Sequence, residues 1–283
     1  MGRKDVARKL RGARGFLFDL DGTLVLGDKK NNRLQALPGV PELLDLLAEQ
    51  GRPFAALTNG TVRPPAEISQ KLAEIGLRIP AGHILTPSTV AAQYFHRRGF
   101  RRILVLGVEG VWQPLADAGL DVVLSSDERA GAGRYDAVFI GWYRQIRMDE
   151  VEVACNAVWN GAGLYAASLV PFFASSHGRA LGSSRAISAM ITSITGKRAT
   201  ALGKPSPHAL RSAADVLGCT PSELVVVGDD PALEVRMALK GGALAVGVHT
   251  GIAGAAEYAA LPEKERPLLS LPNAGELAPY LRA

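Results

Sequence analysis

Short apolar runs alternate along the chain with longer stretches in which apolar residues recur at helical spacing. The predicted strands are Gly15–Leu20, Phe54–Thr58, Ile103–Gly107, Val122–Leu124, Ala137–Gly141, Leu164–Ala167, Leu224–Gly228 and Ala243–Val248. The predicted helices are Pro41–Gln50, Pro65–Ile75, Asp149–Trp159, the stretch from Leu181 to Thr195, and Ser206–Leu217. Such alternation favours parallel strands covered by helices. We therefore expect an α/β fold built on a doubly wound, mostly parallel sheet.

Two segments carry signals for the start of a helix. Ser206 precedes a proline, and Thr220-Pro221-Ser222-Glu223 resembles a capping box, in which threonine and glutamate side chains bind the first backbone N–H groups. We expect a helix to begin at each of them.

The composition is that of an ordinary globular protein, with 47% hydrophobic and 21% charged residues. No apolar run approaches the ~18 residues that a membrane span needs, and the first residues lack the apolar core of a secretory signal. The two cysteines, Cys155 and Cys219, lie far apart and have no partners at metal-ligand spacing. We expect a cytoplasmic protein that does not associate with membranes.

The net charge of +5 and the pI near 9.3 raise the question of nucleic-acid binding. The basic excess is concentrated in residues 3–14, which hold six Lys or Arg residues and one acidic residue, so the rest of the chain is close to neutral. No basic stripe with interleaved aromatic residues follows. A solvated basic leader explains the charge better than a nucleic-acid-binding arm.

The segment Phe16-Leu17-Phe18-Asp19-Leu20-Asp21-Gly22-Thr23 is the most informative one. Residues two apart on a strand point to the same side, so Asp19 and Asp21 can face one site at the end of the first predicted strand. Ligand crevices in open parallel sheets lie beyond this carboxyl edge, and a hard cation such as Mg²⁺ would relieve the repulsion between two close carboxylates. A turn containing two acids could have the same sequence, but the strongly apolar run before it favours a site.

Three further segments have the same form, in which a strand ends in polar groups. Thr58-Asn59-Gly60 offers a hydroxyl and an amide for phosphate oxygens. Lys204, between Gly203 and Pro205, is suited to act as a point charge on a phosphoryl group. The apolar strand Val225–Gly228 leads into Asp229 and Asp230. Taken singly, these segments could be a turn, a surface lysine and an acidic loop.

Together the four segments resemble the haloacid dehalogenase superfamily of phosphohydrolases. Its motifs appear in order as Asp19–Thr23, Thr58, Lys204 and Gly228-Asp229 with the acids that follow. The long gap between the second and third motifs resembles the subclass with a large α/β cap, the p-nitrophenylphosphatase and phosphoglycolate-phosphatase-like branch. The resemblance implies a Rossmann-like core of residues 1–81 and 180–283, and an inserted cap of residues 82–179.

The resemblance also implies roles for the first and fourth motifs. Asp19 would attack phosphorus and form an aspartyl-phosphate, while Asp21 would act as general acid and base. Mg²⁺ would be bound by the Asp19 carboxylate, the Asp21 backbone carbonyl and Asp229, with Glu234 or Asp230 supporting it through water.

The middle motifs would bind the phosphoryl group. Thr58 and Asn59 would orient its oxygens, and Lys204 would neutralise charge together with the metal.

Three positions depart from the family pattern. Glu234 stands where an aspartate is frequent, Tyr143 stands where an aspartate is common, and residues 167–170 read Ala-Ser-Leu-Val where many members have Thr-Asn-x-Asp. The departures concentrate in the cap, so they bear on the substrate more than on the chemistry.

The expected cap carries Arg144, Arg147 and His177 as candidate substrate-binding residues. Arginine side chains suit a carboxylate or a second phosphate on the substrate, although ordinary solvated arginines would explain the same sequence equally well. Phe172 and Phe173 could instead form an apolar wall or belong to the core.

The resemblance predicts a magnesium-dependent phosphomonoester hydrolase that acts on a small phosphorylated metabolite. Asp21 argues against a true dehalogenase, because those enzymes lack a general acid at that position. A phosphotransferase on the same site and a catalytically silent binding protein on the same fold remain alternatives. The oligomeric state stays open, with a homodimer as one option.

Overall fold

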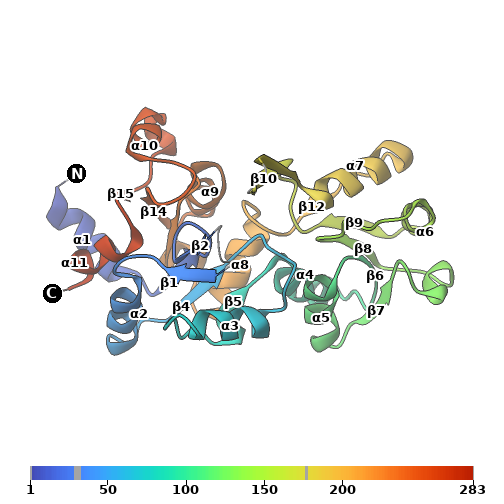
Figure 1. Cartoon of the computed structure of the whole chain (residues 1–283), viewed down its shortest axis with the longest axis horizontal. Helices are drawn as coiled ribbons and strands as arrows, with labels where there is room; N and C mark the ends of the chain where they lie inside the picture. Colours follow the sequence, from blue (N-terminus) through green and yellow to red (C-terminus); the bar gives the residue numbers. More distant parts are fainter. Residues whose placement is uncertain (1, 29–32, 176–177, 283) are drawn as a thin grey trace. The chain divides into compact units, whose positions relative to one another are not determined.

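The computed structural model describes residues 2–28, 33–175 and 178–282. The chain forms two compact units (Figure 1), which we describe separately. Unit 1 comprises Met1–Thr58, Ala66–Leu85 and Pro205–Ala283, and unit 2 comprises Asn59–Pro65 and Thr86–Lys204. Residues 180–204, which the sequence analysis assigned to the core, therefore pack within unit 2.

Unit 1 is built on a six-stranded sheet in the order β15-β14-β13-β1-β4-β5, and all neighbouring strands are parallel. Its strands are β1 (Gly15–Asp19), β4 (Phe54–Leu57), β5 (Ile84–Leu85), β13 (Leu224–Gly228), β14 (Leu244–Val248) and β15 (Leu269–Leu271). Chain order runs outward from β1 to β5 on one side, whereas the later strands lie on the other side. The strand order thus reverses beside β1, where α/β sheets open a ligand crevice.

Helices surround this sheet because its strands are apolar on both sides. Phe16 and Phe18 of β1 pack into one cluster with buried residues of the helices α1, α2, α3 and α11, while the intervening Leu17 points the other way. Helices α8 and α9 pack on each other and on β4, β5 and β14. The helices of unit 1 are α1 (Arg3–Gly12), α2 (Val40–Glu49), α3 (Pro65–Ala73), α8 (Pro207–Val216), α9 (Arg236–Gly241), α10 (Ala255–Ala260) and α11 (Ala278–Leu281).

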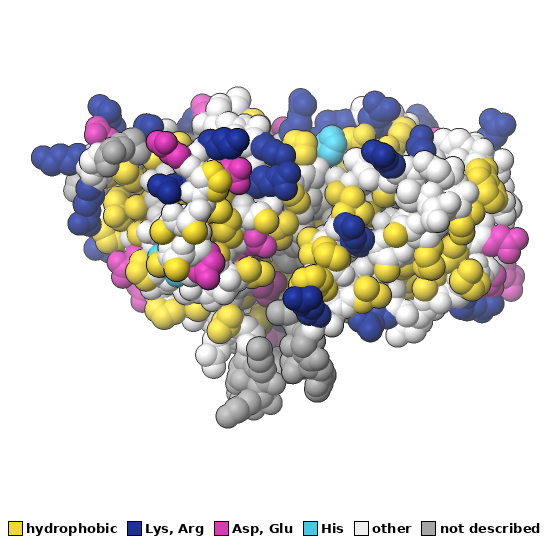
Figure 2. All heavy atoms as spheres, turned by 90° about the horizontal axis from the view of Figure 1, so that it is seen from above, with side chains coloured by type: hydrophobic (Ala, Val, Ile, Leu, Met, Phe, Trp, Pro, Cys, Tyr) yellow, Lys and Arg dark blue, Asp and Glu magenta, His cyan; other side chains and the backbone are white. Residues whose placement is uncertain are grey.

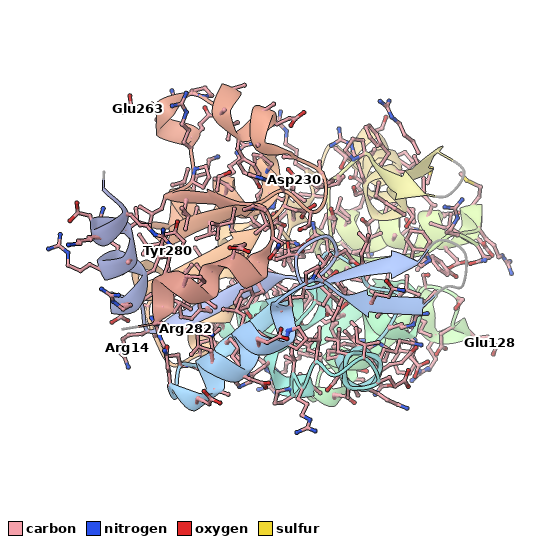
Figure 3. All side chains as sticks on the ribbon, turned by 60° about the vertical axis from the view of Figure 1, so that its left-hand side comes forward. Arg14, Glu128, Asp230, Glu263, Tyr280 and Arg282 are labelled. Carbon is pink, nitrogen blue, oxygen red and sulfur yellow. The ribbon has the colours of Figure 1, made fainter. Side chains whose placement is uncertain are left out.

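The basic leader forms the helix α1, which packs against α11 at the other end of the chain (Figures 1 and 3). Val6 and Leu10 are buried in the core, whereas the Lys and Arg side chains of α1 lie on its exposed face (Figure 2). The Arg11 guanidinium donates to the Arg282 carbonyl at 3.0 Å. The leader is thus solvated on one side only, because its two apolar residues sit one helical turn apart and share a face.

Unit 2 contains a second parallel sheet, in the order β12-β9-β8-β6-β7. Its strands are β6 (Arg102–Leu106), β7 (Asp121–Leu124), β8 (Ala137–Ile140), β9 (Gly163–Ala166) and β12 (Thr200–Ala201). Its helices are α4 (Pro87–Arg97), α5 (Glu109–Asp117), α6 (Met148–Trp159) and α7 (Ser183–Thr195). Helices α6 and α7 pack together with strand residues in one core cluster, and α4 packs on α5. Cys155 is buried in α6.

The remaining elements are short. Two antiparallel hairpins join β2 (Val25–Asp28) to β3 (Arg33–Ala36) and β10 (Phe172–Ser175) to β11 (Gly178–Leu181). The single helical turns are η1 (Ala81–His83), η2 (Glu128–Gly131), η3 (Pro221–Glu223), η5 (Glu263–Glu265) and η6 (Ala274–Leu277), with the π-helical turn η4 (Pro231–Val235). No helix of the described residues is both long and apolar enough to span a membrane.

The α/β fold with parallel sheets and a second α/β unit is confirmed. One helix prediction was wrong, because the capping box at Thr220 begins only the three-residue turn η3. Leu224, which follows at once, starts the fully buried strand β13, and the burial of that strand ends the turn.

Candidate active site

The carboxyl edge of the unit 1 sheet gathers three of the predicted site residues around β1. Asp19 is paired with Leu57 of β4, so Thr58 comes one residue later on that neighbouring strand. On the other side Phe18 is paired with Val227, which puts Asp229 just beyond the end of β13. Asp19, Thr58 and Asp229 are each 5% exposed. Parallel register therefore brings a nucleophile candidate, a hydroxyl and a second carboxylate to one buried edge.

The turn after β1 brings the first and fourth motifs together. Gly22 has φ +84°, and its N–H donates to the Val25 carbonyl at 2.8 Å. A Cβ atom at Gly22 would lie 2.8 Å from Asp229 Oδ2, so the Asp229 carboxylate rests against the backbone of this turn. Asp21, immediately before Gly22, is exposed. Only glycine combines this positive φ with room for the carboxylate.

The loop after β14 holds Asp229 from its other side. The Ile252 N–H donates to Asp229 Oδ2 at 2.7 Å, and the Ala253 N–H donates to the Asp229 carbonyl at 3.2 Å. The Thr250 hydroxyl donates to the Gly22 carbonyl. A Cβ at Gly251 would overlap the Asp229 carboxylate. These contacts fix the direction of the carboxylate before any ligand binds.

Tyr258 fixes the end of β13 from within the core. Its hydroxyl donates to the Gly228 carbonyl at 3.1 Å, and the side chain is 3% exposed. Burial raises the pKa of the Tyr258 hydroxyl, and the nearby Asp229 carboxylate raises it further. The hydroxyl therefore stays protonated and remains a donor.

The fourth motif continues into the π-helical turn η4. The Asp230 side chain caps this turn by accepting the Ala232 N–H at 2.8 Å. Glu234 is 2% exposed, and its Oε2 accepts the Asp230 N–H at 3.1 Å. The longer glutamate side chain therefore reaches back to the residue that follows Asp229.

A divalent cation at this edge would find only oxygen donors. The Asp19 and Asp229 carboxylates and the Asp21 backbone carbonyl could hold it, and hard oxygen ligands suit Mg²⁺. In the part of the chain that the structure describes, no three His, Cys, Asp or Glu side chains cluster as metal ligands. The contacts of Gly22 and Gly251 with Asp229 keep the second carboxylate in place.

Lys204 and Asn59 lie together in unit 2, although they are 145 residues apart in the sequence. The Lys204 N–H donates to Asn59 Oδ1 at 2.8 Å, and Asn59 Nδ2 donates to the Lys204 carbonyl at 3.0 Å. Lys204 is 4% exposed. The Asn59 side chain, next to the second motif, is thus hydrogen-bonded to the backbone of Lys204 in the third motif.

The candidate substrate residues of unit 2 differ in their surroundings. Arg147 forms a two-point ion pair with Asp149, in which Nε lies 3.1 Å from Oδ1. The Arg144 guanidinium lies 5.5 Å from the centroid of the Trp142 ring. His177 lies outside the described residues. Arg147 already has an anionic partner, whereas the Arg144 guanidinium lies over an aromatic ring.

Sequence reasoning missed two sets of residues near these strand ends. In unit 1 it missed Gly251 and Tyr258, although β14 also runs straight into polar residues and a glycine, which is the same signal as in the predicted motifs. In unit 2 it missed the buried Glu150, which accepts the Tyr143 hydroxyl at 2.8 Å and is also bonded to Ser125. No local pattern predicts that second contact.

Replacing Tyr258 by phenylalanine is expected to weaken Mg²⁺ binding about 3- to 10-fold and to lower the free energy of unfolding by about 1 kcal/mol. The reason is that the Gly228 carbonyl loses its buried donor next to Asp229. The dissociation constant is measured by titrating Mg²⁺ against thermal stability without substrate. Tyr280→Phe in α11, whose ring lies against Arg3, is the control and should leave the constant unchanged. Equal Mg²⁺ affinity in both variants would contradict the prediction.

The chain is similar to known hydrolases over most of its length. Residues 16–121 match the haloacid dehalogenase-like hydrolases, and residues 201–276 match the HAD-hydrolase-like family. The chain is 26% identical to the 5'-nucleotidase YutF of Bacillus subtilis, over 95% of this chain and 98% of that protein. It is 27% identical to an acid sugar phosphatase of Staphylococcus haemolyticus, over 91% and 92% of the two chains.

Its fold is similar to that of a thermostable NPPase double mutant from Geobacillus stearothermophilus. The TM-score is 0.78 at 26% identity, covering 94% of this chain and 98% of that one. The two family matches together span more than half of the chain and include all four motifs that end its strands. The chain therefore belongs to the haloacid dehalogenase-like hydrolases.

Proposed function

We propose that this chain is a phosphatase that hydrolyses small phosphomonoesters through an aspartyl-phosphate on Asp19, with Mg²⁺ as its cofactor. The observation that carries the proposal is the meeting of Asp19, Thr58 and Asp229 at the carboxyl edge of the unit 1 sheet, beside the point where strand order reverses. The phosphatase activity also follows from the relatives, which are named 5'-nucleotidase, acid sugar phosphatase and NPPase.

Asp19 is the nucleophile in this proposal. One oxygen of its carboxylate forms a bond to phosphorus while the ester oxygen leaves, and water later cleaves the acyl phosphate to regenerate the carboxylate. The burial of Asp19 limits its hydration, and its place at the end of a rigid central strand fixes the direction of attack. Bound Mg²⁺ would supply positive charge that offsets the repulsion between the two anions.

Asp21 is the general acid and base. In the first step it gives a proton to the leaving oxygen, and in the second step it takes a proton from the attacking water. Its exposure at the turn after β1 allows it to exchange protons with solvent between the steps. Two carboxylates only two residues apart can thus perform different tasks, because Asp19 is buried and Asp21 is exposed.

The remaining residues of the proposed site bind the phosphoryl group or support the metal. Thr58 donates its hydroxyl to a phosphoryl oxygen, and Lys204 supplies a compact positive charge. Asn59 directly follows Thr58, and its side chain is hydrogen-bonded to the Lys204 backbone. Asp229 holds the cation, while Asp230 and Glu234 support the turn that follows Asp229. In this assignment unit 1 is the catalytic core and unit 2 the cap. The cytoplasmic location and a homodimer stay predictions.

A phosphate-release screen over a panel of phosphorylated metabolites tests the proposal. Nucleoside monophosphates and sugar phosphates belong in the panel because the relatives bear those names. We expect Mg²⁺-dependent release from at least one phosphomonoester, with stoichiometric appearance of the free alcohol. Transfer of the phosphoryl group to a second alcohol without net phosphate release would instead identify a phosphotransferase. No reaction with any member would favour the silent binding protein.

Arg144→Ala is expected to raise KM several-fold for a substrate that carries a second anionic group, and to spare p-nitrophenyl phosphate. The reason is that the Arg144 guanidinium lies over the Trp142 ring, whereas the Arg147 guanidinium is already paired with Asp149. Arg147→Ala is the comparison variant and should have the smaller effect. Equal changes of KM for charged and uncharged leaving groups would remove Arg144 from substrate recognition.

A further inference from the structure

The side-chain amide of Asn59 makes the same pair of hydrogen bonds with Lys204 that a neighbouring β-strand would make. Its oxygen accepts the Lys204 N–H at 2.8 Å and its nitrogen donates to the Lys204 carbonyl at 3.0 Å. Strand β12 ends at Ala201, and its hydrogen bonds toward the β9 segment continue through the N–H groups of Leu202 and Gly203. Asn59 therefore satisfies both backbone groups of the next residue, which is buried.

The packing around this amide leaves it little freedom. A Cβ at Gly203 would overlap Asn59 Oδ1 and the Ala167 carbonyl, so the close approach of the amide depends on a glycine at this position. Pro205 follows Lys204 directly, and a proline restricts the backbone of the residue before it. The Lys204 backbone is thus constrained by the Asn59 side-chain amide and by the ring of Pro205.

Asn59 and Lys204 also mark two points at which the chain passes between the units. Asn59 directly follows Thr58, the last residue of the first segment of unit 1, and Lys204 directly precedes Pro205, where unit 1 resumes. The two hydrogen bonds join these two crossing points. They connect the backbone of the proposed lysine to the residue next to the proposed phosphate-binding threonine.

We propose that the Asn59 side chain is a positioning residue that sets the place of the Lys204 ammonium, and that it acts on the phosphoryl group through Lys204. The inference rests on the proposed function. A lysine side chain carries its charge on a flexible four-carbon stem, so the ammonium position is only as well defined as the backbone from which it extends. Burial of Lys204 removes most alternative rotamers once that backbone is fixed. The sequence alone suggested a direct contact of Asn59 with phosphate oxygens, and the two roles predict different coupling between the residues.

The test is a double-mutant cycle with Asn59→Ala, Lys204→Ala and the double variant. The readouts are kcat and KM for p-nitrophenyl phosphate and the affinity for inorganic phosphate, measured from the shift in thermal stability in the presence of Mg²⁺. Asn59→Ala is expected to lower kcat and phosphate affinity by about 10-fold, a coupling typical of residues in contact. In the Lys204→Ala background the same change should alter neither quantity by more than about twofold.

Two further variants keep the outcome decisive if Asn59→Ala folds poorly. Asn59→Asp has nearly the same shape and keeps the acceptor for the Lys204 N–H, but it places a second oxygen against the Lys204 carbonyl. It should fold and show the same loss, again only when Lys204 is present. Asn156→Asp, on the exposed side of α6, adds the same charge elsewhere in unit 2 and should leave kcat and phosphate affinity unchanged.

The possible failures can be told apart. Equal effects of the Asn59 substitutions with and without Lys204 would overturn the positioning role and favour direct contact with the phosphoryl group. Unchanged phosphate affinity in both Asn59 variants would overturn it as well. Wild-type kinetics of Lys204→Ala would contradict the proposed function of the lysine, and the inference would fall with it.

Discussion

Asp19→Asn is expected to reduce the turnover of p-nitrophenyl phosphate by about four orders of magnitude or more. A neutral amide is a poor nucleophile and a weaker ligand for a cation than a carboxylate. Asparagine has nearly the same size, and Asp19 lies at the end of a central strand held by neighbours on both sides, so the fold should persist. The measurement is steady-state phosphate release, with a thermal melt to verify folding.

Asp21→Asn is the matched comparison, because it makes the same chemical change two residues away. It should cost less with p-nitrophenyl phosphate, whose leaving group needs little protonation, than with an alkyl phosphate. Asp19→Asn should inactivate the enzyme toward both substrates. Wild-type rates in a folded Asp19→Asn variant would exclude the aspartyl-phosphate.

Removal of divalent cations by a chelator is expected to abolish activity, and Mg²⁺ is expected to restore it. The Asp19 and Asp229 carboxylates are both buried at one sheet edge, where their charge and that of the substrate phosphate repel each other unless a cation is bound. Ca²⁺ should restore activity poorly, because its larger and looser coordination shell would displace the nucleophile from phosphorus. The measurement is the rate of phosphate release against total added cation.

Thermal stability measured during the Mg²⁺ titration provides a control for the activity measurement. Thermal stability measured without substrate should rise with Mg²⁺ in the wild type and rise less in Asp19→Asn, because that variant loses a charged ligand. Full activity in a metal-stripped sample would show that the two carboxylates function without a cation and would refute the magnesium prediction.

Most of the regular elements could be predicted from local sequence, because the strands are apolar on both sides and the helices carry an apolar stripe. The strand Leu224–Gly228 was predicted to the residue, and β1, β4 and β8 each end one residue before the predicted boundary. The basic leader was harder to interpret. Its charges suggested a solvated segment, but Val6 and Leu10 bury one face of α1 against α11, a partner that is more than 260 residues away.

Some residues of the candidate site could be predicted from the local sequence, and others could not. Asp19, Thr58 and Asp229 could be predicted because each one follows an apolar run, and parallel strands end at one edge of their sheet. The roles of Gly251, Ile252 and Tyr258 around Asp229 could not, because their contacts depend on how the loop after β14 folds back over β13.

Which residue types stand at the ends of the strands follows from the local sequence, because strand periodicity and turn chemistry act over a few neighbouring residues. Tertiary structure alone decided which of these residues contact each other. The pairing of Asn59 with Lys204 across 145 positions is one such contact, and the buried hydrogen bond from Ser125 to Glu150 is another. Such contacts are selected by the packing of whole elements, in which most buried polar groups are hydrogen-bonded, and no local pattern records that choice.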